Sequence, residues 1–579
     1  MWSQTFDPLG HPLASAAVAA LPIVALLWAL IIARLSGVRA GVITLGFALA
    51  IAVFVYGMPV RLALMAAVHG ALYGLFPISW IVFAAVVLYQ VTVRSGRFEI
   101  VKQSIASLTD DRRLQAMLIA FSFGAFLEGA AGFGAPVAIA AGMLVGLGFD
   151  PRYAAGLCLI ANTAPVAFGS IGIPLITASQ ITGVDLHALS QMVGRQLPVL
   201  SLALPFYLVV LMAGWRGLKD VWPAALVSGG SFALAQFAVS NYVGPLLPDI
   251  VSSVVSIVAL IALLRVWHPA RSFRFAHERN EVGRPVAPPV GKTLAAWIPF
   301  ALLTLLVSAW GVKPVQAILD HLTATLPLPL LDHAIVNPDS GRALVAVYRI
   351  NWLSAAGTAV FIAALLSALA VRLTLRGVGE VCARTARQLA WPVSTIALFL
   401  AFAYVGTASG MTTTLGRAVA ETGALFPLFS PLLGWLGVFI TGSDTSANAL
   451  FGRLQQVSAD ALGINPVLTI AANSSGGVTA KMISPQSIAV ACAASGLVGR
   501  EPELLRFTLP HSLVMATLIC VITWLQATWL RWMVPPAAPA AASSAATGSP
   551  ALAVAILALT ATAAASLILV ARRDRTAQS

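Results

Sequence analysis

Two acidic residues stand in polar stretches that interrupt apolar runs of the sequence. Glu128 follows the run 114–126, and Asp444 follows the run 426–440. Both runs are shorter than the roughly 20 apolar residues that a membrane-spanning helix needs. An ionised carboxylate at membrane depth is costly, and binding a proton removes that cost. We therefore predict that Glu128 and Asp444 carry protons. The structural alternative is that each caps a facing helix or pairs with a fixed cation.

The sequence around these carboxyls offers hydroxyls, amides, one ammonium group and glycines that suit a small anion. Glycine lets a ligand approach the backbone closely, and N–H groups at the start of a helix bind anions. Lys481 supplies a positive charge for an anion or for Asp444. The alternative to a role in the site is that its side chain extends to the membrane surface. His69 is a further proton-transfer candidate, although a lone histidine is more often structural. The candidate binding residues are Asn162, Thr163, Ser443, Thr445, Ser446, Asn448, Asn473, Ser474, Ser475, Gly476, Lys481, Gly132 and Gly134.

The composition shows which elements must position these residues. Of 579 residues, 59% are hydrophobic and only 9% are charged, against roughly 25% charged in a soluble domain. Soluble enzymes, DNA-binding modules and secreted disulfide scaffolds are excluded, and the four cysteines show no metal or disulfide spacing. The long apolar runs leave room for about 12–14 spans. The sequence therefore predicts an all-α polytopic membrane protein.

The net charge of +13 comes from basic residues in short linkers between apolar runs, and not from a nucleic-acid-binding surface. Three linkers, 94–113, 265–292 and 372–387, are strongly basic and are predicted to be cytoplasmic. It follows that the N-terminus and the long linker 311–352 lie outside. An Ala/Pro/Ser-rich linker begins at residue 535, and one further helix follows it, with a cytoplasmic C-terminus.

The two interrupted regions share one order of features, which predicts an internal repeat. Each has a short apolar run with a carboxylate, a Gly-x-Asx-Pro turn, an Ala-Asn-Ser/Thr segment and a later proline. Each is interpreted as a re-entrant hairpin followed by a broken helix, and the charge pattern makes the copies inverted. Paired interruptions of this kind point to the substrate site of a secondary transporter. The predicted units are 1–113 (scaffold helices), 114–200 (first repeat), 201–388 (connecting helices with a cytoplasmic loop 268–292), 389–534 (second repeat) and 535–579 (appended helix).

Several long motifs resemble the bacterial L-lactate permease family. The matching stretches are FGAFLEGAAGFGAP at 123–136, NTAPVAFG at 162–169, QMVGRQLP at 191–198, LGWLGVF at 433–439, TGSDTS at 441–446 and MISPQSIA at 482–489. The resemblance extends from Phe6 to about Pro535, and the last helix has no match. It implies proton-coupled uptake of lactate, and in some members glycolate, across the cytoplasmic (inner) membrane.

The residues alone leave alternatives open. Carboxylates, amides and unwound carbonyls would equally suit a sodium site, and the preferred hydroxy acid and its stereoisomer are undetermined. A membrane enzyme is disfavoured because the sequence has no HExxH, GxxxxGK[ST] or GxSxG motif in a suitable setting. A channel is disfavoured because two symmetric interruptions favour alternating access. We expect no cofactor and no resident metal, with the proton as coupling ion and with a small monocarboxylate and the lipid bilayer as partners.

Overall fold

The computed structural model of the chain describes residues 1–33, 35–130, 132, 134–275, 287–310, 312–339 and 341–536. Nine helical segments in these ranges are long and apolar enough to cross a membrane, and one bent helix pair would make a tenth. The predicted all-α polytopic architecture is confirmed. The sequence-based number of about 12–14 spans is higher in part because Leu186–Tyr242 counts once, although it has 57 residues and a backbone break at Gly214. The predicted C-terminal helix after residue 550 lies outside the described residues.

Helices dominate because a helix satisfies its backbone hydrogen bonds within one segment, as a membrane interior requires. The first twelve are α1 (Pro12–Leu27), α2 (Gly37–Phe54), α3 (Val60–Tyr73), α4 (Trp80–Arg94), α5 (Arg97–Ala106), α6 (Arg112–Gln115), α7 (Gly124–Ala130), α8 (Ala135–Gly146), α9 (Pro151–Ala161), α10 (Gly169–Thr182), α11 (Leu186–Tyr242) and α12 (Pro248–Val266). The others are α13 (Val290–Trp310), α14 (Lys313–Asp320), α15 (Ala356–Ala370), α16 (Leu375–Ser409), α17 (Met411–Ala420), α18 (Phe426–Thr441), α19 (Asp444–Ala461), α20 (Pro466–Ala480), α21 (Pro485–Ser495) and α22 (Glu501–Thr528). Short π- or 3₁₀-helical segments are η1 (Trp28–Ile32), η2 (Gly74–Ser79), η3 (Ala116–Phe123), η4 (Val166–Phe168), η5 (Gly423–Leu425), η6 (Lys481–Ile483) and η7 (Arg531–Met533).

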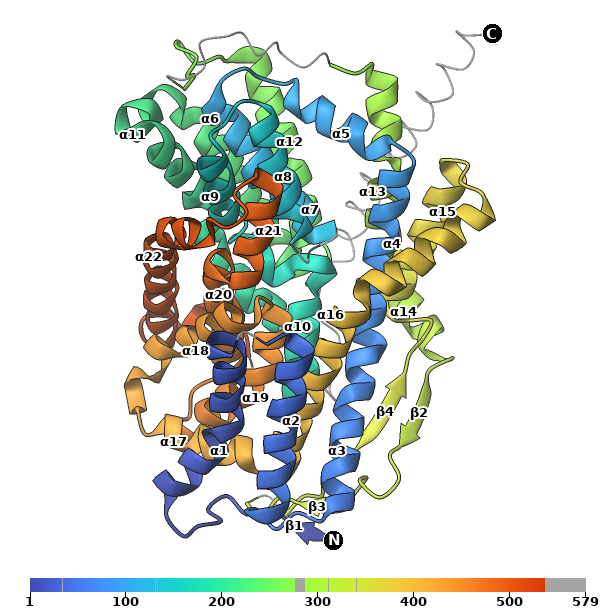
Figure 1. Ribbon diagram of the computed structural model, residues 1–579, viewed down its shortest axis with the longest axis vertical. Helices are drawn as coiled ribbons and strands as arrows, with labels where there is room; N and C mark the ends of the chain where they lie inside the picture. Colours follow the sequence, from blue (N-terminus) through green and yellow to red (C-terminus); the bar gives the residue numbers. More distant parts are fainter. Residues whose placement is uncertain are drawn as a thin grey trace.

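The described parts of the three basic linkers lie in the upper part of the molecule as drawn in Figure 1, on the side of α5 and α6. The Arg113 guanidinium donates a hydrogen bond of 2.8 Å to the Arg271 carbonyl, which joins the first linker to the second. Arg94 forms an ion pair of 2.6 Å with Glu380, which joins the first linker to the third. This is the arrangement that the positive-inside interpretation requires.

The linker 311–352, predicted to be external, contains α14 and three short strands among its described residues. Strand β2 (Ala324–Pro327) pairs antiparallel with β4 (Val347–Ile350). Strand β1 (Trp2–Ser3) pairs in parallel with β3 (Ile335–Val336), which fixes the N-terminus to this linker. Figure 1 shows β1 and β3 at the end opposite to α5 and α6.

Both interrupted regions contain a helical hairpin followed by a broken span. In the first, η3 and α7 lead to a tip at Gly132 and Gly134, and α8 returns. In the second, α18 leads to a tip at Gly442, and α19 returns. Figure 1 shows α7 and α8 above the centre of the molecule and α18 and α19 below it. The inverted repeat itself stays a prediction.

The Asx-Pro turns of the two regions have the same structural role. Asp150 accepts hydrogen bonds from the N–H groups of Arg152 and Tyr153 at the start of α9, and Asn465 accepts one from Val467 at the start of α20. Proline follows each cap at the first helical position, where its missing N–H costs nothing. Helix α9 then breaks, and α10 continues at an angle of 64° to it.

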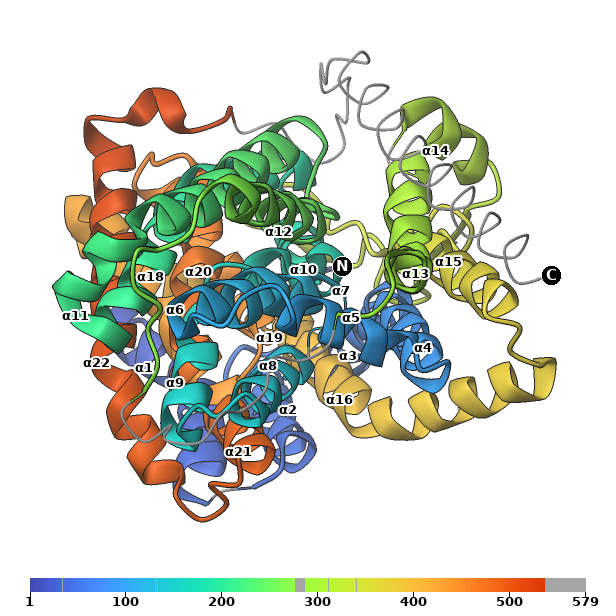
Figure 2. The same cartoon turned by 90° about the horizontal axis from the view of Figure 1, so that it is seen from above.

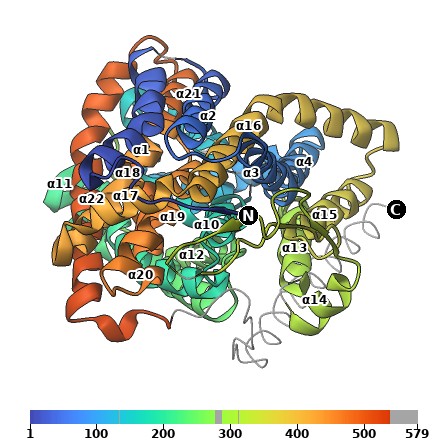
Figure 3. The ribbon, with the colours of Figure 1, turned by 90° about the horizontal axis from the view of Figure 1, so that it is seen from below.

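The two halves contact each other reciprocally. Helix α8 of the first hairpin packs against α21 of the second broken span, and α19 of the second hairpin packs against α10 of the first. Figures 2 and 3 show α13, α14 and α15 together at one side of the molecule, with α16 leading from there to its centre. The hairpins and broken spans therefore form one helical body around a common centre.

Candidate functional site

A cavity of about 1360 Å³ lies where the two hairpins and the two broken spans meet. Residues of α2, α16 and α22 complete its wall. Its volume exceeds the roughly 300–1,000 Å³ of common small-molecule pockets, so it has room for a small solute together with water. The predicted site residues that line it are Glu128, Gly134, Ser443, Asp444, Thr445, Ser446 and Lys481. One cavity thus contains both predicted proton carriers and the predicted ammonium group.

Asp444 is the first residue of α19, directly after the tip of the second hairpin. The preceding Ser443 caps the helix, because its hydroxyl accepts a hydrogen bond from the Ser446 N–H at 3.3 Å. One carboxylate oxygen of Asp444 accepts a hydrogen bond from the Ser474 hydroxyl on α20. The other, Oδ1, has no partner among the described residues. Only 2% of Asp444 is exposed, so the carboxyl has a free acceptor in an almost closed environment.

Behind Asp444, three predicted binding residues form a buried polar network and do not line the cavity. Asn448 donates hydrogen bonds to the Ser474 hydroxyl at 3.1 Å and to the Pro174 carbonyl of α10 at 3.0 Å. Asn473 donates to the Asn448 side-chain oxygen at 2.9 Å and accepts from Gln455 at 3.2 Å. Such a satisfied network fixes the helices that hold Asp444.

Lys481 begins η6 at the break after α20, and it faces the cavity. It is 7% exposed, and no described residue forms a hydrogen bond or an ion pair within 4.0 Å of its ammonium group, while its backbone carbonyl accepts a hydrogen bond from the Ser484 hydroxyl. Asp444 is close enough to attract its charge, but the two groups are not paired. Lys481 is therefore a cation with free donors in the cavity, which is what an anionic solute would need.

Glu128 lies in the last turn of α7, before the tip of the first hairpin. Its Oε2 accepts a hydrogen bond of 3.2 Å from the Asn162 amide, at the end of α9. Gly169 leaves room for the carboxyl, because a Cβ atom there would stand 2.9 Å from Oε1. Asn162 thus contacts the predicted proton carrier and is absent from the cavity lining, and its own side-chain oxygen has no partner among the described residues.

The first hairpin tip rests on a strained segment of the first broken span. Ser170 and Ile171 have positive φ angles of 46° and 61°, a conformation that costs non-glycine residues energy. At Gly132 (φ 55°), a Cβ atom would collide with the Ser170 hydroxyl oxygen. Glycine is therefore required at this position by close packing of the tip, and Gly132 does not line the cavity.

Four further candidates lie outside the cavity lining. Ser475 and Thr163 are fully buried, and their hydroxyls have no partner among the described residues. Gly476 lets α20 approach the Pro431 carbonyl of α18, where a Cβ atom would collide. His69 lies among aromatic rings, 5.2 Å from the Tyr73 centroid and 4.8 Å from that of Tyr404. Their predicted roles receive no geometric support.

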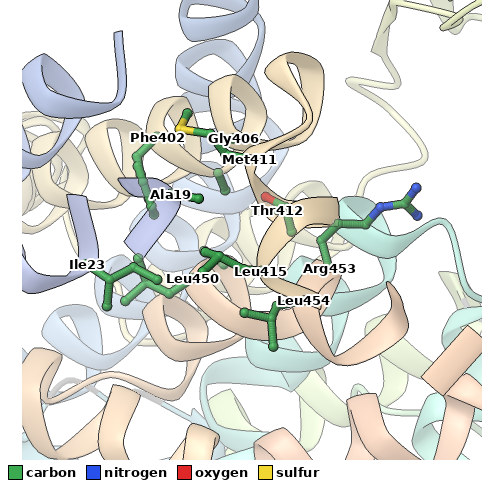
Figure 4. Close-up of a pocket in the computed structure, with 12 residues that line it drawn as sticks. Ala19, Ile23, Phe402, Gly406, Met411, Thr412, Leu415, Leu450, Arg453 and Leu454 are labelled. Atoms are coloured by element: carbon green, nitrogen blue, oxygen red, sulfur yellow. The ribbon is translucent and has the colours of Figure 1, made fainter. Parts of the chain in front are cut away.

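A second cavity, of about 20 Å³, is lined by α1, α16, α17 and α19. Figure 4 shows apolar side chains such as Phe402, Met411 and Leu450 around it, while the guanidinium of Arg453 points away. A space of this size holds roughly one water molecule. It is not a solute site.

Two residues at the site were missed by sequence reasoning. Gln486 lines the cavity and contacts the second hairpin tip, since a Cβ atom at Gly442 would stand 2.5 Å from its Oε1. Gln486 belongs to the motif at 482–489, so the sequence did point to this segment, although Gln486 was not among the predicted site residues. Asp249, in the first turn of α12, is buried beside α7. It precedes an ordinary apolar run and gave no such signal.

Comparison with known proteins assigns the chain to a protein family. The family model described as L-lactate permease matches residues 15–530. The chain belongs to the L-lactate permease family. An L-lactate permease of Bacillus subtilis (strain 168) is 53% identical over 562 residues, covering 92% of this chain and all of the relative. The glycolate permease GlcA of Escherichia coli (strain K12) is 51% identical over 549 residues, covering 91% and 98%.

The membership confirms the predicted family and the prediction of a transporter and not an enzyme, because these relatives are named permeases. Two solved structures are remotely similar. The YdaH transporter of Alcanivorax borkumensis has 15% identity and a TM-score of 0.43 over 81% of this chain and 89% of its own. MtrF of Neisseria gonorrhoeae has 14% identity and a TM-score of 0.40 over 77% and 80%.

Proposed function

We propose that this chain imports L-lactate, and also D-lactate or glycolate, together with protons across the bacterial cytoplasmic membrane. The observation that carries the proposal is the composition of the large cavity. Among the described residues that line it are one buried cation without an ion-pair partner, Lys481, and two buried carboxyls, Glu128 and Asp444, whereas Arg39 is an exposed cation. The names of the relatives supply the substrate class, since they are lactate and glycolate permeases.

The substrate carboxylate binds near Lys481 and the cap of α19. Lys481 has free donors, and the α19 N-terminus presents backbone N–H groups and a positive dipole end beside Thr445 and Ser446. The 2-hydroxyl group of lactate or glycolate then has the hydroxyls of Thr445 and Ser446 and the amide of Gln486 within the same wall. Asn448, Asn473 and Ser474 act by fixing α19 against α20.

The proton binds to a cavity carboxyl, and Asp444 is the first choice. Its Oδ1 is unpartnered and buried, so the neutral form is less costly than the charged form once water is excluded. Lactate and one proton together bring no net charge into the site. The loaded cavity therefore keeps the charge of the empty one, which keeps the cost of translocation low.

The orientation follows from the basic linkers, which meet at one end of the molecule. We assign that end to the cytoplasm. The N-terminus and the linker 311–352, which β1 and β3 join at the opposite end, are then external.

Uptake of radiolabelled L-lactate into proteoliposomes tests the proposal, with a proton gradient and a sodium gradient imposed separately. Protons alone should drive uptake, and Asp444→Asn should abolish accumulation. Asp150→Asn is the matched control, because Asn also caps a helix and Asp150 caps α9 outside the cavity. If uptake requires a sodium gradient, the coupling ion is sodium and not the proton. Absence of any lactate or glycolate uptake would refute the proposed function.

A further inference from the structure

The first half of α16 extends beyond what a membrane span requires. The helix has 35 residues, which is about 52 Å of length, whereas about 20 residues cross the hydrocarbon core. Residues 390–409 contain no charged side chain and are sufficient for that span. The part before them, residues 372–389, is called the arm here and includes the turn that precedes the helix. Figure 2 shows the first half of α16 running outwards from the centre of the molecule towards α15.

One face of the arm is fixed to the rest of the protein. Arg94, at the end of α4, forms an ion pair of 2.6 Å with Glu380 and donates a hydrogen bond of 3.4 Å to the Gly377 carbonyl. Side chains at a spacing of four residues are buried on this face, namely Val381, Thr385 and Leu389. The orientation of the arm is therefore set by α4, and its other face is exposed.

The exposed face carries a cluster of arginines. Glu380 is the one acidic residue in the sequence of the arm, and it already pairs with two arginines. The spacing of Arg376, Arg384 and Arg387 puts their side chains on one side of the helix. Within the part of the chain that the structure describes, three exposed guanidinium groups form no ion pair or hydrogen bond, those of Arg372, Arg384 and Arg387.

Apolar side chains beside the arginines place the arm against lipid. Leu369, at the end of α15, is 74% exposed, and Leu375, at the start of α16, is 91% exposed. Arg372 lies between them in the chain. Burial of leucine in hydrocarbon is favourable, while an arginine at the boundary extends its charge to the headgroups. An anionic phospholipid supplies both an acyl chain and a phosphate group, whereas a free phosphate supplies the charge alone.

We propose that the arm binds the headgroups of anionic phospholipids through Arg372, Arg384 and Arg387. A guanidinium group suits this ligand because its fork of N–H donors matches a phosphate. The assignment to the cytoplasmic leaflet rests on the orientation proposed above, and anionic lipids of that leaflet attract polybasic segments beside a membrane span. The lipid contact is independent of the transported solute. Helix α16 continues from the arm into residues that line the large cavity, Pro392 and Thr395, so bound lipid holds a helix of the cavity wall.

Native mass spectrometry of the purified full chain in detergent tests this binding, with short-chain phosphatidylglycerol added at increasing concentrations. The wild type should bind phosphatidylglycerol in preference to phosphatidylcholine of equal chain length. Each arginine near an anionic lipid surface strengthens binding by about fivefold, so Arg384→Gln/Arg387→Gln should weaken it by about 25-fold. Arg384→Lys/Arg387→Lys keeps both charges and should lose much less.

The matched control is Arg61→Gln/Arg349→Gln, which removes the same charge from exposed residues of α3 and β4. It should bind phosphatidylglycerol as the wild type does. If the double Gln variant does not fold, Arg372→Gln alone should still lose about fivefold. Lactate uptake is not measured in this experiment, so a failure of the proposed function leaves its outcome unchanged.

Equal affinity of the wild type and the Gln variants for phosphatidylglycerol would overturn the lipid site. Equal binding of phosphatidylcholine would also overturn it, because the contact would then be apolar alone. Displacement of the lipid by inorganic phosphate at equal concentration would assign the arginines to a soluble anion instead. A dimer mass that is lost in the double Gln variant would assign this face to a contact between two copies of the chain, and not to lipid.

Discussion

Replacing Lys481 by Gln tests how the cavity binds its anion. The substitution keeps a polar side chain of similar length and removes the charge. Lys481 is 7% exposed and is unpaired among the described residues, so its charge is available to a substrate carboxylate. We expect Lys481→Gln to raise the KM for L-lactate strongly, while the protein remains folded.

The magnitude follows from Coulomb's law. Two unit charges about 4 Å apart attract by about 4 kcal/mol at an effective dielectric constant near 20. Desolvation of the carboxylate and water in the large cavity offset part of this, which leaves about 2 kcal/mol. Each 1.4 kcal/mol is a factor of ten, so the expected loss of apparent affinity is about 30-fold. Lys481→Arg keeps the charge and should lose much less.

Concentration-dependent uptake in proteoliposomes measures this effect, with Arg39→Gln as control. Arg39 lines the cavity but is exposed, and solvent screening should keep its effect below about fivefold. An unchanged KM in Lys481→Gln would refute the assignment of Lys481 to the substrate. Recovery of affinity in Lys481→Gln/Asp444→Asn would show instead that Lys481 only neutralises Asp444.

Three further predictions concern residues outside the substrate contacts. His69→Gln should leave proton-driven uptake unchanged, because His69 lies among aromatic rings and does not line the cavity. A loss of proton coupling in this variant would support His69 as a proton-transfer residue. Gly476→Ala should destabilise the protein by about 1–3 kcal/mol through overpacking, measured as a lower melting temperature in detergent, because a Cβ atom would collide with the Pro431 carbonyl. Arg113→Met should cost about 3–5 kcal/mol, because it leaves the 2% exposed Asp111 without its partner at 2.7 Å; an equal melting temperature would contradict this.

The architecture of the site could be predicted from the sequence, because residues that interrupt a membrane-spanning apolar run are easily recognised. Glycine, proline and a carboxylate inside apolar runs predicted hairpins and broken spans, and the structure places such breaks after α9 and α20. The two Asx-Pro turns were recognisable since a capping side chain and a following proline are local signals. Asp444 and Glu128 were found in the same way, and both line the cavity.

The direction in which each polar side chain points could not be predicted from the sequence. Ser446 lines the cavity, whereas Asn448, two residues further along α19, points into the network with Asn473. The position of a residue around α19 decides between these roles. Which face of α19 lines the cavity depends on the helices that pack against it. Asp249 was missed for a related reason, because its neighbour Glu128 is far away in the chain and only the packing of α12 on α7 brings them together.

The distribution of charge between the two halves bears on how transport is coupled. Lys481 and Asp444 belong to the second hairpin and broken span, whereas Glu128 and Asp249 belong to the first hairpin and the helix behind it. The proposed anion-binding cation, Lys481, therefore has Asp444 beside it and Glu128 in the same cavity, whereas Asp249 does not line the cavity. In the proposed function, an arriving carboxylate adds negative charge to a cavity wall that holds two acids, Glu128 and Asp444. Repulsion between like charges then favours proton binding whenever lactate is bound, and lactate binding whenever a proton is bound. By reciprocity of binding energies, lactate and the proton of the proposed symport would each favour the binding of the other without direct contact between them.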